Sequence, residues 1–439
     1  STAATCCSTA ATRARMSDQP GTAASGDVDE PTRVAIACQG GGSHTAFTCG
    51  VLRTLLGEWN EDYELVGISG TSGGAFNALA VWYGLVTDGP GRAREVVGDV
   101  WDDLAVDGPG DRWTNSLVTS LSRMESAGVP MPRVSPYQVP GPETGKQRIR
   151  DVLESHIDFD EIPDLCGRKS PELVVGTVDI NAGVFETFTN EDVTVDAVLA
   201  SAAVPNLFEA VEIDGHYHWD GLFSQNPPVS DLMGQPPERK PEELWVIQVN
   251  PQGFEGEPTT SEVIADRRNE LSGNISLNQE LGFIERVNDW VETGKLPADE
   301  FTKTEIHRIE MGRQYHCSTK VDRDPAFLDE LRELGAQRAR AFLDEREVGA
   351  ETRRAIAETF ADRERIVVES LPDFIDREKL ADFTDHGLAT DVAVGLETAT
   401  DRVRHDCVNK YFDFDDFVAA TEEADAAGAG VKAYLLMKP

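Results

Sequence analysis

The stretch GISGTSGGAFNALA, residues 67–80, decides how the rest of this sequence is interpreted. Its apolar beginning is followed by glycines and then by an alanine-rich segment, a pattern that predicts a buried strand, a sharp turn and a helix. Ser72 lies in the frame Gly70-x-Ser72-x-Gly74, which presents a serine nucleophile at such a turn. A serine hydroxyl is a poor nucleophile until a base takes its proton, so an active Ser72 requires a base elsewhere in the chain.

The segments around this turn predict an α/β fold. Short apolar runs typical of buried strands alternate with segments of helical pattern. This alternation favours a mainly parallel central sheet flanked by helices. Strands are expected in 34–38, 63–69, 171–180, 242–250 and 307–311, and helices in 45–56, 73–85 and from Asp324 onward, where Asp324 can cap the first turn.

Composition predicts three parts of the chain. Residues 1–31 are rich in Ser, Thr and Ala and are expected to be a disordered N-terminal segment. Residues 32–345 carry the α/β pattern. Residues 346–439 are charged and read as a mostly helical C-terminal extension of unknown role. Residues 127–146 contain five Pro and three Gly, which predicts an irregular loop suited to a lid or access segment.

The formal net charge of −38, from 78 acidic and 40 basic residues, excludes several partners. Nucleic-acid binding needs Lys and Arg, and an anionic membrane repels such a chain. The acid excess is typical of a protein of a salt-rich cytoplasm, where ions screen the repulsion. Seven scattered Cys fit a reduced, cytoplasmic protein. Residues 65–87 are uncharged but rich in Gly, so a soluble chain is expected.

A glycine-rich turn, QGGGSH at 39–44, follows the first predicted strand. Backbone N–H groups in such a turn can stabilise the oxyanion of acyl transfer, which makes Gly40, Gly41 and Gly42 candidate donors. A nucleotide phosphate loop is the rival interpretation. It is disfavoured because no Lys follows the turn and because Thr45 stands where GxGxxG requires Gly.

Asp220, in HWDGLFSQNPP, is the candidate base. An Asp beside the serine can accept its proton directly. A triad of the α/β-hydrolase order remains open through a late histidine. The histidines that meet this order are His307, His316, His386 and His405.

Other roles for the same residues also remain open. Ser72 can cap a helix, Asp220 can order a loop, and the three glycines can serve close packing of helix on strand. His216 and His218 with Asp220 resemble a metal site, but no fourth ligand is evident and we expect no metal.

Three segments together, QGGGSHTAFTCGVL, GISGTSGGAFNALA and LASAAVPNLFEAVEIDGHYHWDGLFSQNPP, resemble the patatin-like phospholipases, in particular their intracellular bacterial and archaeal branch. The resemblance implies a three-layer α/β/α fold over about residues 32–345. It also implies a Ser–Asp dyad that needs no metal or cofactor. By this resemblance Ser72 is the nucleophile, Asp220 the base and the glycine run the oxyanion hole. Four residues support these groups: His44, Gly70, Gly74 and Gly221.

The chain departs from the family pattern at three positions: His44 replaces the usual Arg or Lys, Thr45 a Gly, and Leu222 a Gly or Ala. We expect His44 to supply partial positive charge near the oxyanion and Thr45 to stiffen the turn. These departures bear on rate and substrate geometry more than on reaction type.

Three functions follow as hypotheses. The first is a cytoplasmic serine acyl-ester hydrolase of lipids, in peripheral contact with a membrane. The second keeps the dyad but acts on storage granules, as a polyhydroxyalkanoate depolymerase similar to haloarchaeal patatin-like proteins. The third is a non-catalytic lipid- or granule-binding regulator, because fold alone does not fix function. The sequence leaves the oligomeric state open.

Overall fold

The computed structural model describes residues 31–435 except 61, 127–134, 139, 140, 206, 224, 255, 298–300, 348, 349, 362, 371, 373, 374, 401–411 and 413. The predicted disordered segment, save its last residue, therefore lies outside the described residues, as do His405 and half of the expected loop at 127–146. In the part that is described, no helix combines the length and apolarity needed to cross a membrane.

The strands form two sheets among the described residues. The strands of the larger sheet are β1 Thr32–Cys38, β2 Tyr63–Gly70, β3 Glu172–Asp179, β4 Val184–Thr189, β5 Val211–Ile213, β6 His216–Asp220, β7 Glu243–Gln248 and β8 Glu305–Glu310. Their order is β5-β6-β3-β2-β1-β7-β8, and β4 pairs with β3. Strands β1, β2, β3, β7 and β8 are parallel, while β4 and β6 run antiparallel to β3.

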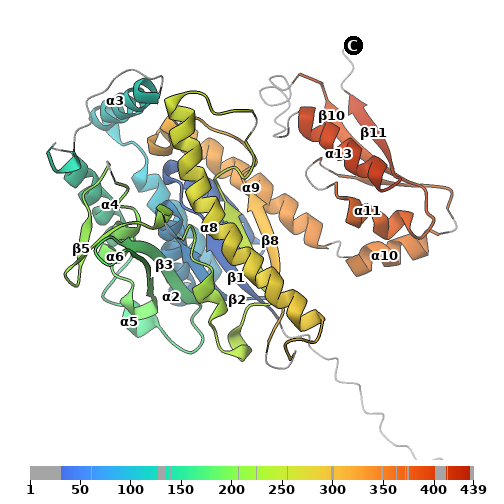
Figure 1. The fold of residues 1–439 in the computed structure, drawn as a ribbon, viewed down its shortest axis with the longest axis horizontal. Helices are drawn as coiled ribbons and strands as arrows, with labels where there is room; N and C mark the ends of the chain where they lie inside the picture. Colours follow the sequence, from blue (N-terminus) through green and yellow to red (C-terminus); the bar gives the residue numbers. More distant parts are fainter. Residues whose placement is uncertain are drawn as a thin grey trace, which may run out of the picture.

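The helices that accompany this sheet lie on both of its faces (Figure 1). They are α1 Ala46–Gly57, α2 Gly73–Leu104, α3 Gly108–Ser126, α4 Pro142–His156, α5 Ile162–Leu165, α6 Val195–Ser201, α7 Ser230–Met233, α8 Ser261–Glu292 and α9 Pro325–Glu347. Helix α2 is kinked at Asp88 and Gly89, where the backbone leaves helical geometry.

Strand β1 shows why the sheet is covered on both sides. Side chains alternate between the two faces of a strand. Val34 and Ile36 belong to the core that includes α1, α2 and α9. Ala35 and Ala37 belong to a second core that includes α7 and α8. A continuous apolar run is thus buried on both faces, as the sequence predicts for a central parallel strand, and the layers are α/β/α.

The structure confirms most of the predicted elements. Helix α9 begins after Asp324, whose carboxylate accepts a hydrogen bond from the Ala326 N–H at 3.0 Å. The segment before Asp220 forms the hairpin of β5 and β6. Asp214 and Gly215 turn it with positive φ of 52° and 83°, a conformation that favours an Asp-Gly pair. The expected loop at 127–146 ends in α4, which begins at Pro142.

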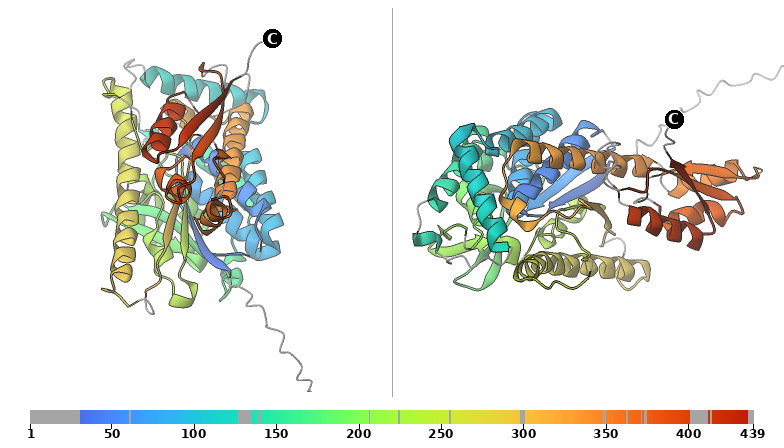
Figure 2. Two further views of the ribbon diagram at one scale, coloured as in Figure 1. Left: turned by 90° about the vertical axis from the view of Figure 1, so that its right-hand side faces the viewer. Right: turned by 90° about the horizontal axis from the view of Figure 1, so that it is seen from above.

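The C-terminal part is helical, as expected, but it also contains a sheet that the sequence reading did not predict. Its helices are α10 Ala350–Thr359, α11 Arg377–Thr384 and α13 Phe414–Ala426, and its strands are β9 Ile366–Glu369, β10 Thr390–Glu397 and β11 Gly430–Leu435. The three strands are parallel, in the order β11-β10-β9, with a separate small core. This sheet lies beyond the end of α9, to one side of the larger sheet (Figures 1 and 2).

Candidate active site

Ser72 occupies the sharp turn between β2 and α2. Its φ of 57° and ψ of −129° place a non-glycine residue in a region that L side chains rarely adopt. The Ser72 N–H donates to Ser201 Oγ at 2.9 Å, and Ser201 Oγ donates to the Gly176 carbonyl at 2.7 Å. Ser201, which the sequence reading did not single out, therefore connects this turn to β3. The strained backbone is the geometry expected of a nucleophile turn.

The glycines that flank Ser72 are required by close packing. A Cβ on Gly70 would collide with the backbone of Gly74, and a Cβ on Gly74 would collide with the carbonyl of Cys38 at the end of β1. The turn can therefore fold back tightly against β1 only because both positions lack a side chain.

Asp220 lies at the end of β6, opposite Thr177 of β3. It is 1% exposed, and its backbone N–H donates to the Ala203 carbonyl at 3.1 Å. The Ser72 hydroxyl lies near enough to this carboxylate to lower its pKa, and Asp220 Oδ1 accepts the Leu222 N–H at 2.8 Å. The structure therefore places the two residues singled out by the sequence near one another. Leu222 contributes its backbone, so this departure from the family pattern leaves the contact intact.

Burial controls the protonation of Asp220. Desolvation raises its pKa from an ordinary 3.8 to about 7, and the hydrogen bonds from Leu222 and Ser72 oppose this shift. Since a general base works best with a pKa near the working pH, this environment suits proton transfer from a serine. Gly221, next in the chain, packs against the backbone of Gly176 and has no room for a Cβ.

The glycine turn follows β1, whose two neighbours are β2 and β7. The chain order reverses at β1, and parallel sheets commonly place ligand sites at the carboxyl ends of strands around such a reversal. A short 3-10 helix, η1 Gly42–Thr45, continues the turn into α1. Thr45 Oγ1 donates to the Gly42 carbonyl at 2.6 Å and so fastens the turn.

The three glycines differ in what their N–H groups bind. The Gly40 N–H donates to Asn226 Oδ1 at 2.6 Å, so it is already engaged and is not available to an oxyanion in this conformation. The prediction that Gly40 donates there is therefore corrected. No hydrogen-bond partner is found among the described residues for the N–H of Gly41 or Gly42. Gly42 has a φ of 60°, which favours glycine.

The side chain of Asn226 fixes the glycine turn by hydrogen bonds. The sequence analysis did not identify this residue. Besides accepting from Gly40 N–H, its Nδ2 donates to the Gly40 carbonyl at 3.3 Å. Asn250 Nδ2 donates to the same carbonyl at 3.2 Å. Gln39 Oε1 in turn accepts the Asn250 N–H at 2.8 Å. These buried amides fix the turn through its backbone, and the only sequence signal was the neighbouring Asp220 motif.

His44 does not carry the positive charge that we expected of it. It is 3% exposed, its ring lies tilted against Tyr315 and edge-on to Phe327, and its Nε2 contacts Thr319 Oγ1 at 2.8 Å. Desolvation, reinforced by the nearby charge of Lys320, lowers its pKa to about 3. His44 is therefore neutral at neutral pH, and its role is to pack the glycine turn against the segment around Thr319.

The remaining histidines engage groups other than the candidate pair. His307 lies near Glu243 and Glu305, and His316 Nδ1 contacts Ser318 Oγ. His386 is exposed after α11. Within the described residues, no hydrogen bond joins Ser72 or Asp220 to an imidazole.

The suspected metal set of His216, His218 and Asp220 does not converge. His216 Nδ1 pairs with Asp179 at 2.6 Å, and His218 Nε2 pairs with Glu186 at 2.6 Å. Asp179, Glu186 and His218 do place ligand atoms within 4.8 Å of one another. Their close hydrogen bonds account for this grouping without an ion.

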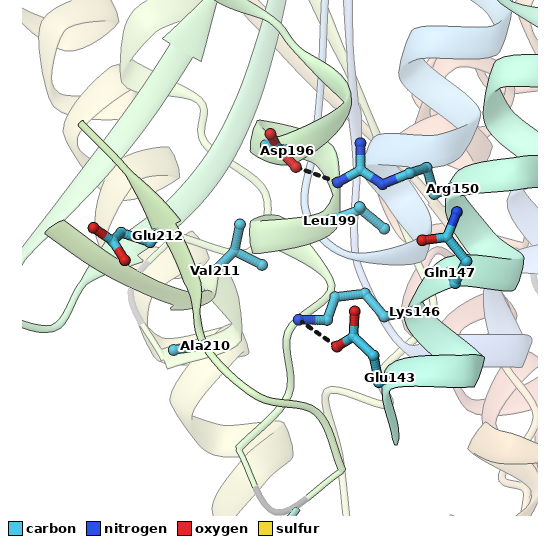
Figure 3. Close-up of a pocket in the computed structure, with 9 residues that line it drawn as sticks. All are labelled: Glu143, Lys146, Gln147, Arg150, Asp196, Leu199, Ala210, Val211 and Glu212. Atoms are coloured by element: carbon cyan, nitrogen blue, oxygen red, sulfur yellow. Dashed lines mark hydrogen bonds and ion pairs between the residues drawn. The ribbon is translucent and has the colours of Figure 1, made fainter. Parts of the chain in front are cut away.

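A polar pocket of about 250 Å³ lies between α4, α6 and β5 (Figure 3). Its cations are paired: Lys146 with Glu143 at 3.5 Å, and Arg150 with Asp196. Neither Ser72 nor Asp220 lines it. Because its charges are compensated, the pocket is not an anion site for the candidate chemistry.

Comparison with known proteins gives two kinds of match. The model of the patatin-like phospholipase family matches residues 36–233, which include Ser72, Asp220 and the glycine turn. Archaeosine synthase subunit beta of Methanosarcina acetivorans is 35% identical over 125 residues, which are 27% of this chain and 35% of that protein. The same subunit of Thermococcus kodakarensis is 42% identical over 104 residues, 23% of this chain and 32% of that protein. The chain thus spans about a third of these curated relatives.

Among solved structures, the complex of ExoU with SpcU from the type III secretion system of Pseudomonas aeruginosa matches at 14% identity. The match covers 90% of this chain and 75% of that chain with a TM-score of 0.26, too low to support a conclusion. The likeness to the patatin-like phospholipases rests instead on the family model that matches residues 36–233. Residues 36–233, a little less than half of the chain, therefore resemble the patatin-like phospholipase family.

Proposed function

We propose that this chain is a serine acyl-ester hydrolase that acts on lipids, with Ser72 as nucleophile and Asp220 as general base. The observation that carries the proposal is the buried Asp220 carboxylate beside the Ser72 hydroxyl, at a strained strand-to-helix turn within the residues that match the patatin-like family. A nucleophile in contact with a buried base is the signature of covalent acyl transfer.

The geometry supports a two-step reaction. As Ser72 Oγ attacks the acyl carbonyl, Asp220 accepts the hydroxyl proton, and the oxyanion forms beside the glycine turn. Gly41 and Gly42 N–H groups would stabilise it. Asp220 then returns the proton to the leaving alcohol as the ester bond breaks. In the second step Asp220 takes a proton from water, which attacks the acyl-serine, and the proton returns to Ser72 as the free acid leaves.

Hydrolysis of a water-soluble p-nitrophenyl ester tests the proposal. We expect Ser72→Ala to abolish turnover and to prevent labelling by a fluorophosphonate probe. Ser69→Ala is the matched control, because Ser69 Oγ is buried in β2 with no hydrogen-bond partner in the described part of the chain. Turnover that survives Ser72→Ala in a folded protein would refute the nucleophile assignment.

The substrate class is tested by comparing phospholipid vesicles with native polyhydroxyalkanoate granules. Release of fatty acid supports the lipid reading, and release of 3-hydroxyacids with intact vesicles supports the granule alternative. A folded protein without activity on either, or on the soluble ester, would support a binding role. The name of the curated relatives points to another activity, which we do not transfer, because the chain spans only about a third of them.

A further inference from the structure

Helix α3 is attached to the body of the protein through its polar side. Asn115 and Thr119 are buried, although both are polar. Asn115 Nδ2 donates to Asp322 Oδ1 at 2.8 Å, and its Oδ1 accepts the Arg323 N–H at 3.0 Å. One turn earlier, Asp111 pairs with Arg323 at 2.6 Å. The contacts that hold α3 in place are therefore hydrogen bonds and ion pairs.

Three apolar residues in the described part of α3 are exposed. Trp113 is 69% exposed, and Leu117 and Val118 are each 41% exposed. A surface helix normally buries its apolar stripe and exposes its polar one. At these described positions the polar side chains are buried and the apolar ones are exposed, so the three apolar side chains, which we call the α3 surface, lose the free energy that burial would provide. Exposed apolar patches of this kind mark interaction sites.

The α3 surface belongs to the end of the molecule that carries the candidate active site. Helix α3 contacts the 3-10 helix η6 Cys317–Val321, and Arg123 donates to Ser318 Oγ at 3.4 Å. Helix η6 in turn contacts η1, where Thr319 meets His44 and the Lys320 carbonyl packs on Gly42. One chain of contacts thus joins α3 to the glycine turn.

A second row of exposed apolar side chains lies on α8, which contacts α3. Ile264, Leu271 and Ile275 are 43%, 37% and 51% exposed, at helical spacings of seven and four. Figure 1 shows α3 beside the upper end of α8, where α8 begins. Apolar exposure therefore gathers on two neighbouring helices at one end of the protein.

The charge of α3, compared with that of the whole chain, indicates the kind of surface that this helix can bind. Residues 108–126 contain two acidic residues, Asp111 and Glu125, and two basic residues, Arg112 and Arg123. Helix α3 is thus neutral in a chain whose formal net charge is −38. An anionic membrane would repel the rest of the molecule, whereas an uncharged interface would accept tryptophan and aliphatic side chains without that penalty.

We propose that α3 lies on the surface of a zwitterionic phospholipid bilayer, with Trp113, Leu117 and Val118 in the interfacial layer, and that it thereby presents the Ser72 site to lipid. Tryptophan is favoured in that layer because its ring is apolar and its N–H is polar. This inference deepens the proposed function and rests on it for the identity of the substrate.

Binding is tested without turnover, in full-length Ser72→Ala protein mixed with phosphatidylcholine vesicles and sedimented. We expect the double variant Trp113→Ser, Leu117→Ser to reduce the vesicle-bound to unbound ratio roughly tenfold or more, since both side chains are exposed when the protein is in solution. Phe283→Ser is the matched control. Phe283 is 57% exposed in the other half of α8, and its loss should leave binding unchanged.

Catalysis supplies a second measurement, in protein with Ser72 intact. The double variant should hydrolyse vesicle phospholipid several-fold more slowly and a soluble p-nitrophenyl ester at the normal rate. The inference fails if parent and double variant bind vesicles equally, if only polyhydroxyalkanoate granules are bound, or if the double substitution converts a dimer to a monomer. Failure of the proposed function is separate: Ser72→Ala would then retain esterase activity, whatever α3 binds.

Discussion

The two sheets of this protein are built from similar parts and differ in what their strand ends carry. Both contain parallel strands joined by helices. In the larger sheet the chain order reverses at β1, and the glycine turn and Ser72 follow the neighbouring strands β1 and β2. In the smaller sheet, β9, β10 and β11 lie in sequence order with no reversal. Parallel strands alone therefore do not make a site. A site also requires a point where the strand order reverses, because there the turns that follow two neighbouring strands lead to opposite faces of the sheet.

The two sheets also differ in the environment of their buried carboxylates. In the larger sheet Asp220 is buried beside Ser72, and burial raises its pKa to about 7. In the smaller sheet Asp391 pairs with Arg365 at 2.6 Å and Lys432 at 2.9 Å, and these cations lower its pKa. One carboxylate is kept ready to accept a proton, whereas the other is held ionised and paired. The comparison predicts chemistry in the larger sheet alone.

Removing the candidate base should have the largest effect. Asp220→Asn keeps the shape of the side chain but cannot accept a proton, so we expect kcat on a soluble ester to fall about 10³-fold, within the range for a general base. Asp391→Asn is the matched control in the smaller sheet and should leave kcat unchanged. Equal losses in the two variants would break the comparison.

The raised pKa of Asp220 should affect activity and stability in opposite directions: as the pH rises towards 7, kcat/KM should increase and the contribution of Asp220 to stability should decrease. The base must be deprotonated, so kcat/KM should rise with pH and level off above about pH 7. The folded protein binds this proton more tightly than the unfolded chain. Its contribution to stability is therefore full below about pH 4 and is lost as the pH rises to about 7.

Two measurements check these signs: a pH–rate profile for soluble ester, and the free energy of unfolding of the parent and of Asp220→Asn at pH 5 and pH 8. Relative to the parent, Asp220→Asn should gain stability between those two pH values. A profile that levels off near pH 4 would mean that Asp220 is not the titrating base.

Asn226→Ala should have an intermediate effect, because it removes both hydrogen bonds to the Gly40 backbone. We expect kcat to fall about 10²-fold as the oxyanion donors lose their position, with KM little changed. Asn288→Ala is the matched control, since Asn288 holds the N–H and C=O of Thr304 in the same way, outside the site. Both variants should lose about 1–3 kcal/mol of stability. If kcat falls in Asn226→Ala but not in Asn288→Ala, the role of Asn226 is to position the glycine turn.

The sequence allowed much of the larger sheet and the proximity of Ser72 to Asp220 to be predicted. Uncharged apolar runs and glycine turns are local signals, so β1, β2 and α1 could be located from short segments. The proximity of Ser72 and Asp220 came from the resemblance to the patatin-like family. Their catalytic roles stay predictions until the variants above are measured.

The parts that could not be predicted depend on contacts distant in sequence. Whether Gly40 N–H faces the substrate or Asn226 is decided by a residue 186 positions away. The neutrality of His44 depends on Tyr315 and Phe327, which bury it from α9 and the segment before it. The smaller sheet was missed because two of its strands are short or exposed, so their apolar pattern is weak.

The smallest effect on activity should come from the core of the smaller sheet. Val394 of β10 and Val246 of β7 are both fully buried, so each Val→Ala change should cost about 2 kcal/mol by removing methyl groups from a packed core. If the two sheets unfold separately, Val394→Ala will lower hydrogen-exchange protection only in β9 to β11 and leave ester hydrolysis unchanged. Val246→Ala will lower protection in β1 and β7 instead, next to the glycine turn. Loss of protection in both sheets from either change would show that the two sheets unfold as one cooperative unit. The sheets would then differ in the chemistry of their side chains and not in their free energy of unfolding.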